Sequence, residues 1–260
     1  MKKVISLVAL ILILITSVLS FASCAKSNIT VDISKENIGV DISQDLYGLF
    51  IEDISYACDG GLVSNLIANT SFDYKAAPLT NWTINDLDYK VDNEFSMNEN
   101  NQSYLKITSN GEGMLRNSGY VEYYEYLSKK YKKEFQNDMG FRKDVDYEFV
   151  CYVKNIDFEG KMKVGLSSSY SGELLDVEIP NSGSDWTKVT KTLHANETED
   201  GGLAIEIQGN GTLCLDSFEL IPKDSYGYDS DKWKYVSLRT DLFNALKELN
   251  PSFVRFPGGC

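Results

Sequence analysis

The sequence predicts a mixed fold, in which an antiparallel β-sandwich is inserted between the first strand and the first long helix of an α/β domain. Three observations lead to this prediction. An apolar run that ends at Glu52 and Asp53 shows little alternation, which is typical of a strand buried on both faces. Alternating polar and apolar runs then fill residues 72–222. After Pro222, a helical pattern precedes a second apolar strand.

Residues 1–23 have the pattern of a secretory signal peptide. Lys2 and Lys3 form a short positive region, and residues 4–19 are almost wholly apolar. Residues 21–24 read FASC, which resembles the lipoprotein box of bacteria, although Phe21 stands where such boxes usually carry Leu. We expect secretion, with lipid on Cys24 as the anchor that holds the protein at a membrane or cell surface. An ordinary signal peptide is the alternative.

Residues 29–71 are expected to carry an N-terminal strand and the first strand of the α/β domain. Residues 29–33 alternate and predict a short strand. The apolar run within residues 40–53 predicts the buried strand. After the Gly60–Gly61 break, the run LVSNLIA at 62–68 predicts a short helix.

Residues 72–222 are predicted to form the sandwich. Short strands of period two, separated by clusters of Asn, Gly, Asp and Ser, indicate antiparallel sheets. The predicted strands lie at 104–109, 147–154, 161–168, 186–193, 203–209 and 213–221. The stretch 120–136 is rich in Tyr, Lys and Glu, and we interpret it as an excursion from the sandwich that forms a loop or a helix.

Residues 223–260 are predicted to contain a helix and a second buried strand. The helix covers 239–250, with Thr240 as candidate N-cap and Pro251 as the residue that stops it. One helical face carries Leu242, Phe243, Leu246 and Leu249. The strand at 253–256 then ends in Pro-Gly-Gly.

The composition narrows the classes of partner. The chain has 260 residues, with 25 Lys plus Arg against 38 Asp plus Glu, a formal net charge of -13. Such a chain repels phosphate backbones and anionic membrane surfaces, so we expect no nucleic acid partner. Its one histidine, His194, argues against histidine-based metal or triad chemistry, whereas neutral ligands such as sugars are not disfavoured.

The cysteines other than Cys24 carry no recognisable motif. Four remain, which permits three disulfide pairings, and the sequence does not choose among them. The chain has no Cys-x-x-Cys, so neither a redox nor a zinc motif is present. Cys151 and Cys214 lie in alternating apolar runs and are expected to be small buried residues.

Two motifs resemble a known enzyme family. LYGLFIED at 46–53, followed by YACDGGLVSNLIANTSFD at 56–73, resembles the opening of the α-L-arabinofuranosidases of glycoside hydrolase family 51. LFNALKELNPSFVRFPGGC at 242–260 resembles the first barrel helix and second barrel strand of that family. The middle of the chain is similar in pattern to β-sandwich carbohydrate-binding modules, through Trp82, DWTKVTKTL and LCLDSFELIP.

The resemblance implies the start of a TIM-type (β/α)8 barrel and a retaining hydrolysis of terminal α-L-arabinofuranosyl groups from arabinose-containing hemicellulose, with no cofactor and no metal. The two catalytic glutamates of the family lie on later barrel strands. The resemblance therefore implies an N-terminal fragment with no catalytic residue before position 260. The alternative is a glycan-binding lipoprotein that hydrolyses nothing. The oligomeric state is not predicted.

The resemblance also assigns substrate-binding residues at strand ends, where TIM barrels place their active sites. Glu52 matches a glutamate that hydrogen-bonds hydroxyls of the bound arabinose; the alternative is a solvated acid or a turn cap. Gly258 and Gly259 would let the backbone pass close to a sugar, or form an ordinary turn. Cys260 stands where relatives line the pocket. Glu52 and Asp53 cannot be the catalytic pair, because neighbours on a strand point to opposite faces.

Aromatic side chains provide candidates for stacking on sugar rings. Trp82 lies in a polar stretch and is a possible stacking residue, with burial in the core as the alternative. Trp186, in a sandwich strand, is expected in the core. Tyr120, Tyr123, Tyr124 and Tyr126 are expected either to stack on sugars or to cover an apolar surface.

Overall fold

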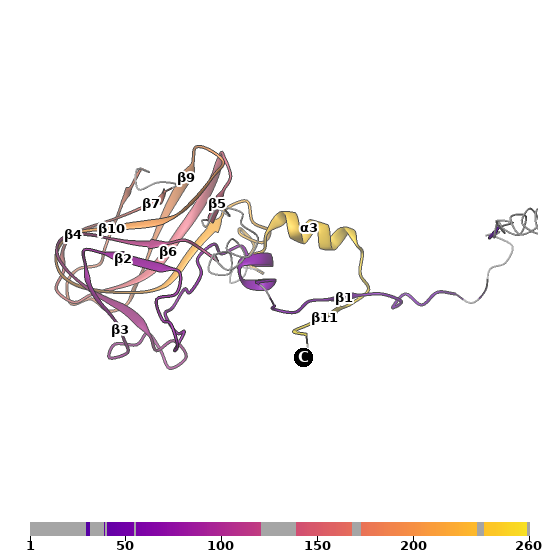
Figure 1. The fold of residues 1–260 in the computed structure, drawn as a ribbon, viewed down its shortest axis with the longest axis horizontal. Coiled ribbons are helices and arrows are strands. Elements are labelled where there is room, and N and C mark those ends of the chain that lie inside the picture. Colours follow the sequence, from indigo (N-terminus) through magenta and orange to yellow (C-terminus); the bar gives the residue numbers. More distant parts are fainter. Residues whose placement is uncertain are drawn as a thin grey trace, which may run out of the picture. The chain divides into compact units, whose positions relative to one another are not determined.

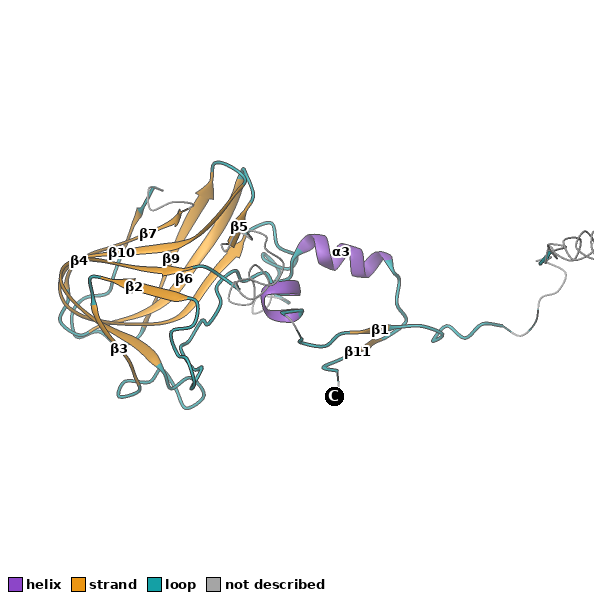
Figure 2. Cartoon of the chain, in the orientation of Figure 1, coloured by secondary structure: helices purple, strands orange, loops and turns teal. Residues whose placement is uncertain are grey.

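A computed structural model describes residues 30–31, 39, 41–54, 56–120, 139–167, 173–232 and 237–258. Contacts divide the chain into two units, Met1–Gln44 and Asp45–Cys260, and the described helices and strands lie in the second. Figure 2 shows that strands make up most of the regular structure of the second unit. The signal segment at 1–23, Cys24, Gly259 and Cys260 lie outside the described residues, as do most of 29–33 and of the stretch 120–136.

The sandwich consists of antiparallel strands, as predicted (Figure 1). Two long strands, β4 (Tyr104–Asn117) and β10 (Glu199–Pro222), pair with each other along most of their length. The other strands of the sandwich are β2 Trp82–Asn85, β3 Asp88–Asp92, β5 Met139–Phe141, β6 Val145–Asn155, β7 Glu159–Ser167, β8 Leu175–Val177 and β9 Thr187–Ala195. At one end of the long pair, β3 pairs with β4, β6 pairs with β10, and β9 pairs with β6. At the other end, β2 pairs with β4, β7 pairs with β10, and β8 pairs with β7.

Glycines mark the place where the long strands pass from one half of the sandwich to the other. Gly209 of β10 lies opposite Gly111 of β4 and Gly160 of β7. A Cβ at Gly211 would lie 2.5 Å from the carbonyl oxygen of Asp157, and its φ of +114° is one that other residues rarely adopt. The predicted strands 203–209 and 213–221 are therefore one continuous strand, because the glycines between them continue the extended backbone instead of forming a turn.

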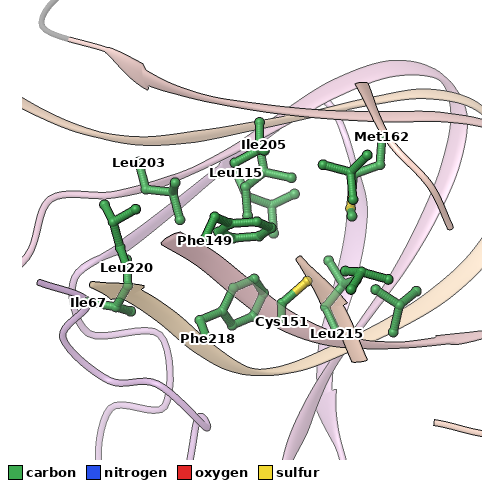
Figure 3. Packing of buried hydrophobic residues seen from close by; sticks show 14 of the residues in the cluster. Ile67, Leu115, Phe149, Cys151, Met162, Leu203, Ile205, Leu215, Phe218 and Leu220 are labelled. Carbon is green, nitrogen blue, oxygen red and sulfur yellow. The ribbon is translucent and has the colours of Figure 1, made fainter. Parts of the chain in front are cut away.

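The core lies between the two halves of the sandwich. Inward-facing side chains alternate along the strands, as period-two patterning requires. Figure 3 shows Phe149 and Phe218 in the middle of this cluster, with Cys151 and Leu215 beside them. The rings of Phe72 and Trp82 extend the cluster, with ring centroids 5.5 Å apart. Burying side chains of this size stabilises the fold by roughly 1.5–3 kcal/mol each.

The helix predicted at 62–68 is absent, and the segment is extended. A single irregular turn, η1 (Cys58–Leu62), precedes it. Leu66 then donates its backbone N–H to the carbonyl of Leu220 at 3.0 Å, and Ile67 is fully buried in the core. Pairing with β10 satisfies the backbone and buries the apolar side chains, so tertiary packing outweighs the local helical pattern.

The C-terminal segment contains the predicted helix, α3 (Thr240–Glu248), and strand β11 (Val254–Arg255). Thr240 is the first helical residue rather than the cap, and its hydroxyl donates to the carbonyl of Asp224 at 2.8 Å. The ring of Phe243 stacks on Tyr226 with centroids 3.7 Å apart. None of the described helices is long and apolar enough to cross a membrane.

Candidate functional site

The carboxyl ends of two parallel strands form one edge. Strand β1 (Leu49–Phe50) pairs with β11, with Leu49 opposite Val254. Leu49 donates its N–H to the carbonyl of Phe253, and Ile51 to that of Arg255, both at 2.9 Å. Because the strands run in the same direction, the residues that follow each of them, Glu52 and Gly258, lie at the same end of the pair. The non-alternating apolar runs and the helix between them predicted parallel strands, and the family resemblance predicted that these two strands are neighbours.

Glu52 and Gly258 are in close contact. Gly258 has a φ of +108°, and a Cβ built on it would lie 2.7 Å from Cγ of Glu52 and 3.1 Å from its Cδ. The Glu52 side chain is partly buried. It therefore lies against the backbone of the neighbouring strand end, while its carboxylate remains able to accept hydrogen bonds from a ligand.

Arg255 also belongs to this small sheet, although the sequence pattern did not single it out. Its guanidinium lies 5.1 Å from the ring centroid of Phe50, the residue opposite it in the register. Phe50 and Glu52 are two residues apart on one extended segment and therefore point to the same face. A charged residue inside the apolar run FVRF was the available signal.

Asp53 has a separate role from Glu52. Its Oδ1 accepts a hydrogen bond from the backbone N–H of Cys58 at 3.2 Å, so it holds the start of η1. Burial raises the pKa of the Cys58 thiol, and the nearby carboxylates of Asp53 and Asp59 raise it further. This thiol therefore stays protonated at neutral pH and is a poor nucleophile.

Trp82 is buried, which was the alternative to sugar stacking, and Trp186 lies at the edge of the core rather than within it. Trp82 is only 7% exposed, its indole N–H donates to the carbonyl of Asn69 at 2.9 Å, and its ring lies 4.7 Å from Phe218. A ring this deep in the core offers no face to a glycan, so stacking by Trp82 is excluded in this structure. Trp186 is instead half-buried, and its N–H donates to the carbonyl of Phe95 at 2.7 Å.

A large cavity in the described part of the chain lies away from Glu52. Its volume is about 1170 Å³, and its walls include Ser64, Tyr120, Arg142, Asp200 and Arg239, whereas neither Glu52 nor Gly258 lines it. Tyr120 also contacts Tyr56, with ring centroids 5.3 Å apart. Among the described residues, no group of three or more His, Cys, Asp or Glu is arranged to hold a metal ion.

The chain is similar to several known α-L-arabinofuranosidases, although no protein-family model matches it. It is 29% identical over 227 residues to an extracellular exo-α-L-arabinofuranosidase of Streptomyces chartreusis, which covers 82% of this chain and 24% of that protein. It is also 29% identical over 230 residues to α-L-arabinofuranosidase 2 of Arabidopsis thaliana, which covers 82% of this chain and 31% of that protein.

A solved structure shows that the fold is shared. The arabinose-bound structure of a GH51 α-L-arabinofuranosidase superposes with a TM-score of 0.64 at 24% sequence identity. The match covers 83% of this chain and 34% of the other chain. The chain thus spans about a quarter to a third of the length of these relatives.

Proposed function

We propose that this chain, which is related to the α-L-arabinofuranosidases of glycoside hydrolase family 51, supplies the N-terminal part of an enzyme that removes terminal α-L-arabinofuranosyl groups from arabinose-containing glycans. Strands β1 and β11 are the first two strands of its barrel. The catalytic glutamates of the retaining mechanism lie beyond residue 260. Residues 72–222 form an inserted sandwich of the carbohydrate-binding type.

The parallel pairing that brings Glu52 to one edge with Gly258 carries this proposal. An ionised carboxylate at such an edge accepts strong hydrogen bonds from two sugar hydroxyls. Gly258, which follows the second strand, lies at the same edge, and Gly259 and Cys260, which the resemblance assigns to the same subsite, lie outside the described residues. If the two strands were antiparallel, Glu52 and Gly258 would lie at opposite ends of the pair.

The exposed apolar side chains of β1 and β11 also support a barrel. Phe50 is 54% exposed and Val254 is 55% exposed, although both lie in strands that the sequence pattern predicts to be buried. Parallel strands are normally covered on both faces. Further strands and helices would provide this cover, as they do in a (β/α)8 barrel.

We further propose that the enzyme is secreted, and that a lipid on Cys24 anchors it to the membrane. The Streptomyces relative is named an extracellular enzyme. Its substrate is then a polysaccharide or oligosaccharide outside the cell. Digestion of the purified native protein with a protease, and mass spectrometry of its N-terminal peptide, test the anchor: a lipid-modified Cys24 supports it, and an unmodified Cys24 contradicts it.

Kinetics of Glu52→Gln in the complete enzyme test the site. The substitution keeps the shape and removes the charge, so it weakens charge-assisted hydrogen bonds by roughly 1.5–3 kcal/mol, and kcat/KM falls about ten- to a hundredfold. The melting temperature stays near that of the wild type. Asp53→Ala is the matched control, because losing the bond to Cys58 lowers the melting temperature and leaves kcat/KM near normal. Normal kinetics in Glu52→Gln contradict the assignment.

A further inference from the structure

The chain has many glycines with positive φ, but their surroundings differ. Gly183 has a φ of +75° and no atom within 4 Å of an added Cβ. Gly258 has a φ of +108° and places an added Cβ 2.7, 2.9 and 3.1 Å from the Cγ, Cβ and Cδ of Glu52. Real Cβ atoms do not approach other atoms as closely as the first two of these distances. Gly258 is therefore constrained twice, by its own backbone and by Glu52.

We propose that Gly258 is a positioning residue: because it has no side chain, the end of β11 passes directly against Glu52 and holds the carboxylate of Glu52 at the shared edge of β1 and β11. The inference rests on the proposed role of Glu52 in the sugar site. It differs from the direct sugar contact expected from the sequence, because the atoms beside the Cα of Gly258 belong to Glu52.

The pairing of the two strands prevents the structure from making room for a larger residue. Ile51, immediately before Glu52, donates its N–H to the carbonyl of Arg255 at 2.9 Å, three residues before Gly258. A methyl group at position 258 can displace the outer part of the Glu52 side chain by rotation. The contact with Cβ of Glu52 remains, since that atom is fixed to the backbone that directly follows β1, so the strand end must also move.

A displaced Glu52 would impair the site without touching the substrate itself. Misplacing a group that orients a substrate by about 1 Å can reduce the rate a hundredfold. We therefore expect Gly258→Ala to lower kcat/KM of the complete enzyme about ten- to a hundredfold. Gly183→Ala is the matched control, because it carries the cost of a positive φ with no contact, and it leaves kcat/KM unchanged.

A double-mutant cycle with Glu52→Ala tests whether Gly258 acts through Glu52. That substitution removes Cγ and Cδ, which are two of the three atoms in contact. In its background, adding Gly258→Ala lowers the melting temperature less than it does in the wild type, and lowers kcat/KM no further. If Gly258→Ala alone does not fold, Glu52→Gly takes the place of Glu52→Ala, because it removes all three contacting atoms; recovery of folded protein in that double variant supports the contact, and failure to recover it overturns the proposal.

The outcomes separate this inference from the proposed function. If Glu52→Ala keeps normal kcat/KM, Glu52 lies outside the sugar site, and the proposed function fails while the coupling in melting temperature persists. If Glu52→Ala loses activity but Gly258→Ala does not, the positioning role is overturned and the proposed function stands. Losses in kcat/KM that multiply in the double variant also overturn it, since they show two independent effects.

Discussion

Asp216 makes the stability of the sandwich depend on pH. The residue lies on β10 and is fully buried. Burial raises the pKa of its carboxyl group from the usual 3.8 to about 7, although hydrogen bonds from the backbone of Ser217 and the amide of Asn101 act in the opposite direction. These bonds measure 2.7 and 2.9 Å. The carboxylate of Asp73 also raises the pKa.

Whether stability rises or falls with pH depends on the pH at which the folded and the unfolded chain each release the proton of Asp216. The unfolded chain loses the proton of Asp216 near pH 4, and the folded chain keeps it until about pH 7. The folded state therefore binds one more proton in this window, so the free energy of unfolding falls as the pH rises from 4 to 7 and levels off above that. Three pH units at 1.36 kcal/mol each set an upper value of about 4 kcal/mol.

Asp216→Asn removes this dependence and keeps a hydrogen bond to both neighbours. The new amide oxygen accepts from the backbone N–H of Ser217. The Asn101 amide, whose NH2 group donates to Asp216 in the wild type, turns over so that its Oδ1 accepts from the new NH2 group, which reverses the bond between the two side chains. We expect the variant and the wild type to have similar stability at pH 4. At pH 8 the variant is more stable, by about 2–4 kcal/mol.

Urea unfolding between pH 4 and 8, monitored by tryptophan fluorescence, measures the difference in free energy of unfolding between the wild type and Asp216→Asn. Asp185→Asn is the control: the hydrogen bond from the Trp186 backbone and the Lys154 ammonium lower the pKa of the exposed Asp185, so its contribution is lost only below about pH 4, and this variant keeps the pH dependence of the wild type between pH 4 and 8. If the free energies of unfolding of the wild type and Asp216→Asn differ by the same amount at every pH, the reasoning is refuted.

Three further predictions concern the sandwich and the activity. Trp82→Ala lowers the free energy of unfolding, measured with urea, by about 3–5 kcal/mol, because it leaves a cavity in the core. A smaller loss in Trp82→Ala than in Trp186→Ala would contradict this burial. A segment of residues 64–222 unfolds at higher urea than 72–222, because Ile67 and the bond from Leu220 to Asn65 belong to the sandwich; equal midpoints would contradict this. Residues 1–260 alone release no arabinose from an aryl α-L-arabinofuranoside, and measurable turnover would show that the catalytic carboxylates lie within them.

Alternation predicted the sandwich strands well, and it failed where tertiary contacts decide. The runs at 147–154 and 186–193 are strands because their inward side chains share one core. The run at 62–68 has a helical spacing of apolar residues, but its backbone pairs with β10, and that partner lies more than 150 residues away in sequence. Local patterning does not contain such a contact.

The two tryptophans illustrate the same limit. A tryptophan in a polar stretch favours exposure, but Trp82 follows a turn that directs it against Phe72 and Phe218. Trp186 precedes an alternating strand and still lies outside the core, where its ring contacts that of Tyr104 at 5.5 Å. Burial of a large ring depends on which face of the sheet the strand presents, and this is set by the register with its neighbours.

The candidate site was predicted in part. The apolar run predicted that Glu52 ends a strand, and the family resemblance implied its role in sugar binding, which stays a prediction; the structure places it beside Gly258. The contact itself, the cation–π pair of Arg255 with Phe50, and the bond from Cys58 to Asp53 were not predicted. Each depends on strands or turns meeting in space, and neither composition nor spacing specifies such meetings.

The location of the sugar relative to Glu52 is the central claim, and one measurement tests it directly. A crystal structure of the complete enzyme with bound arabinose gives the distances from the carboxylate oxygens of Glu52 to the sugar hydroxyls. We predict at least one of them between about 2.5 and 3.0 Å, as in a hydrogen bond of a hydroxyl to an ionised acceptor. An arabinose bound elsewhere, with Glu52 bonded only to protein groups, would contradict the account.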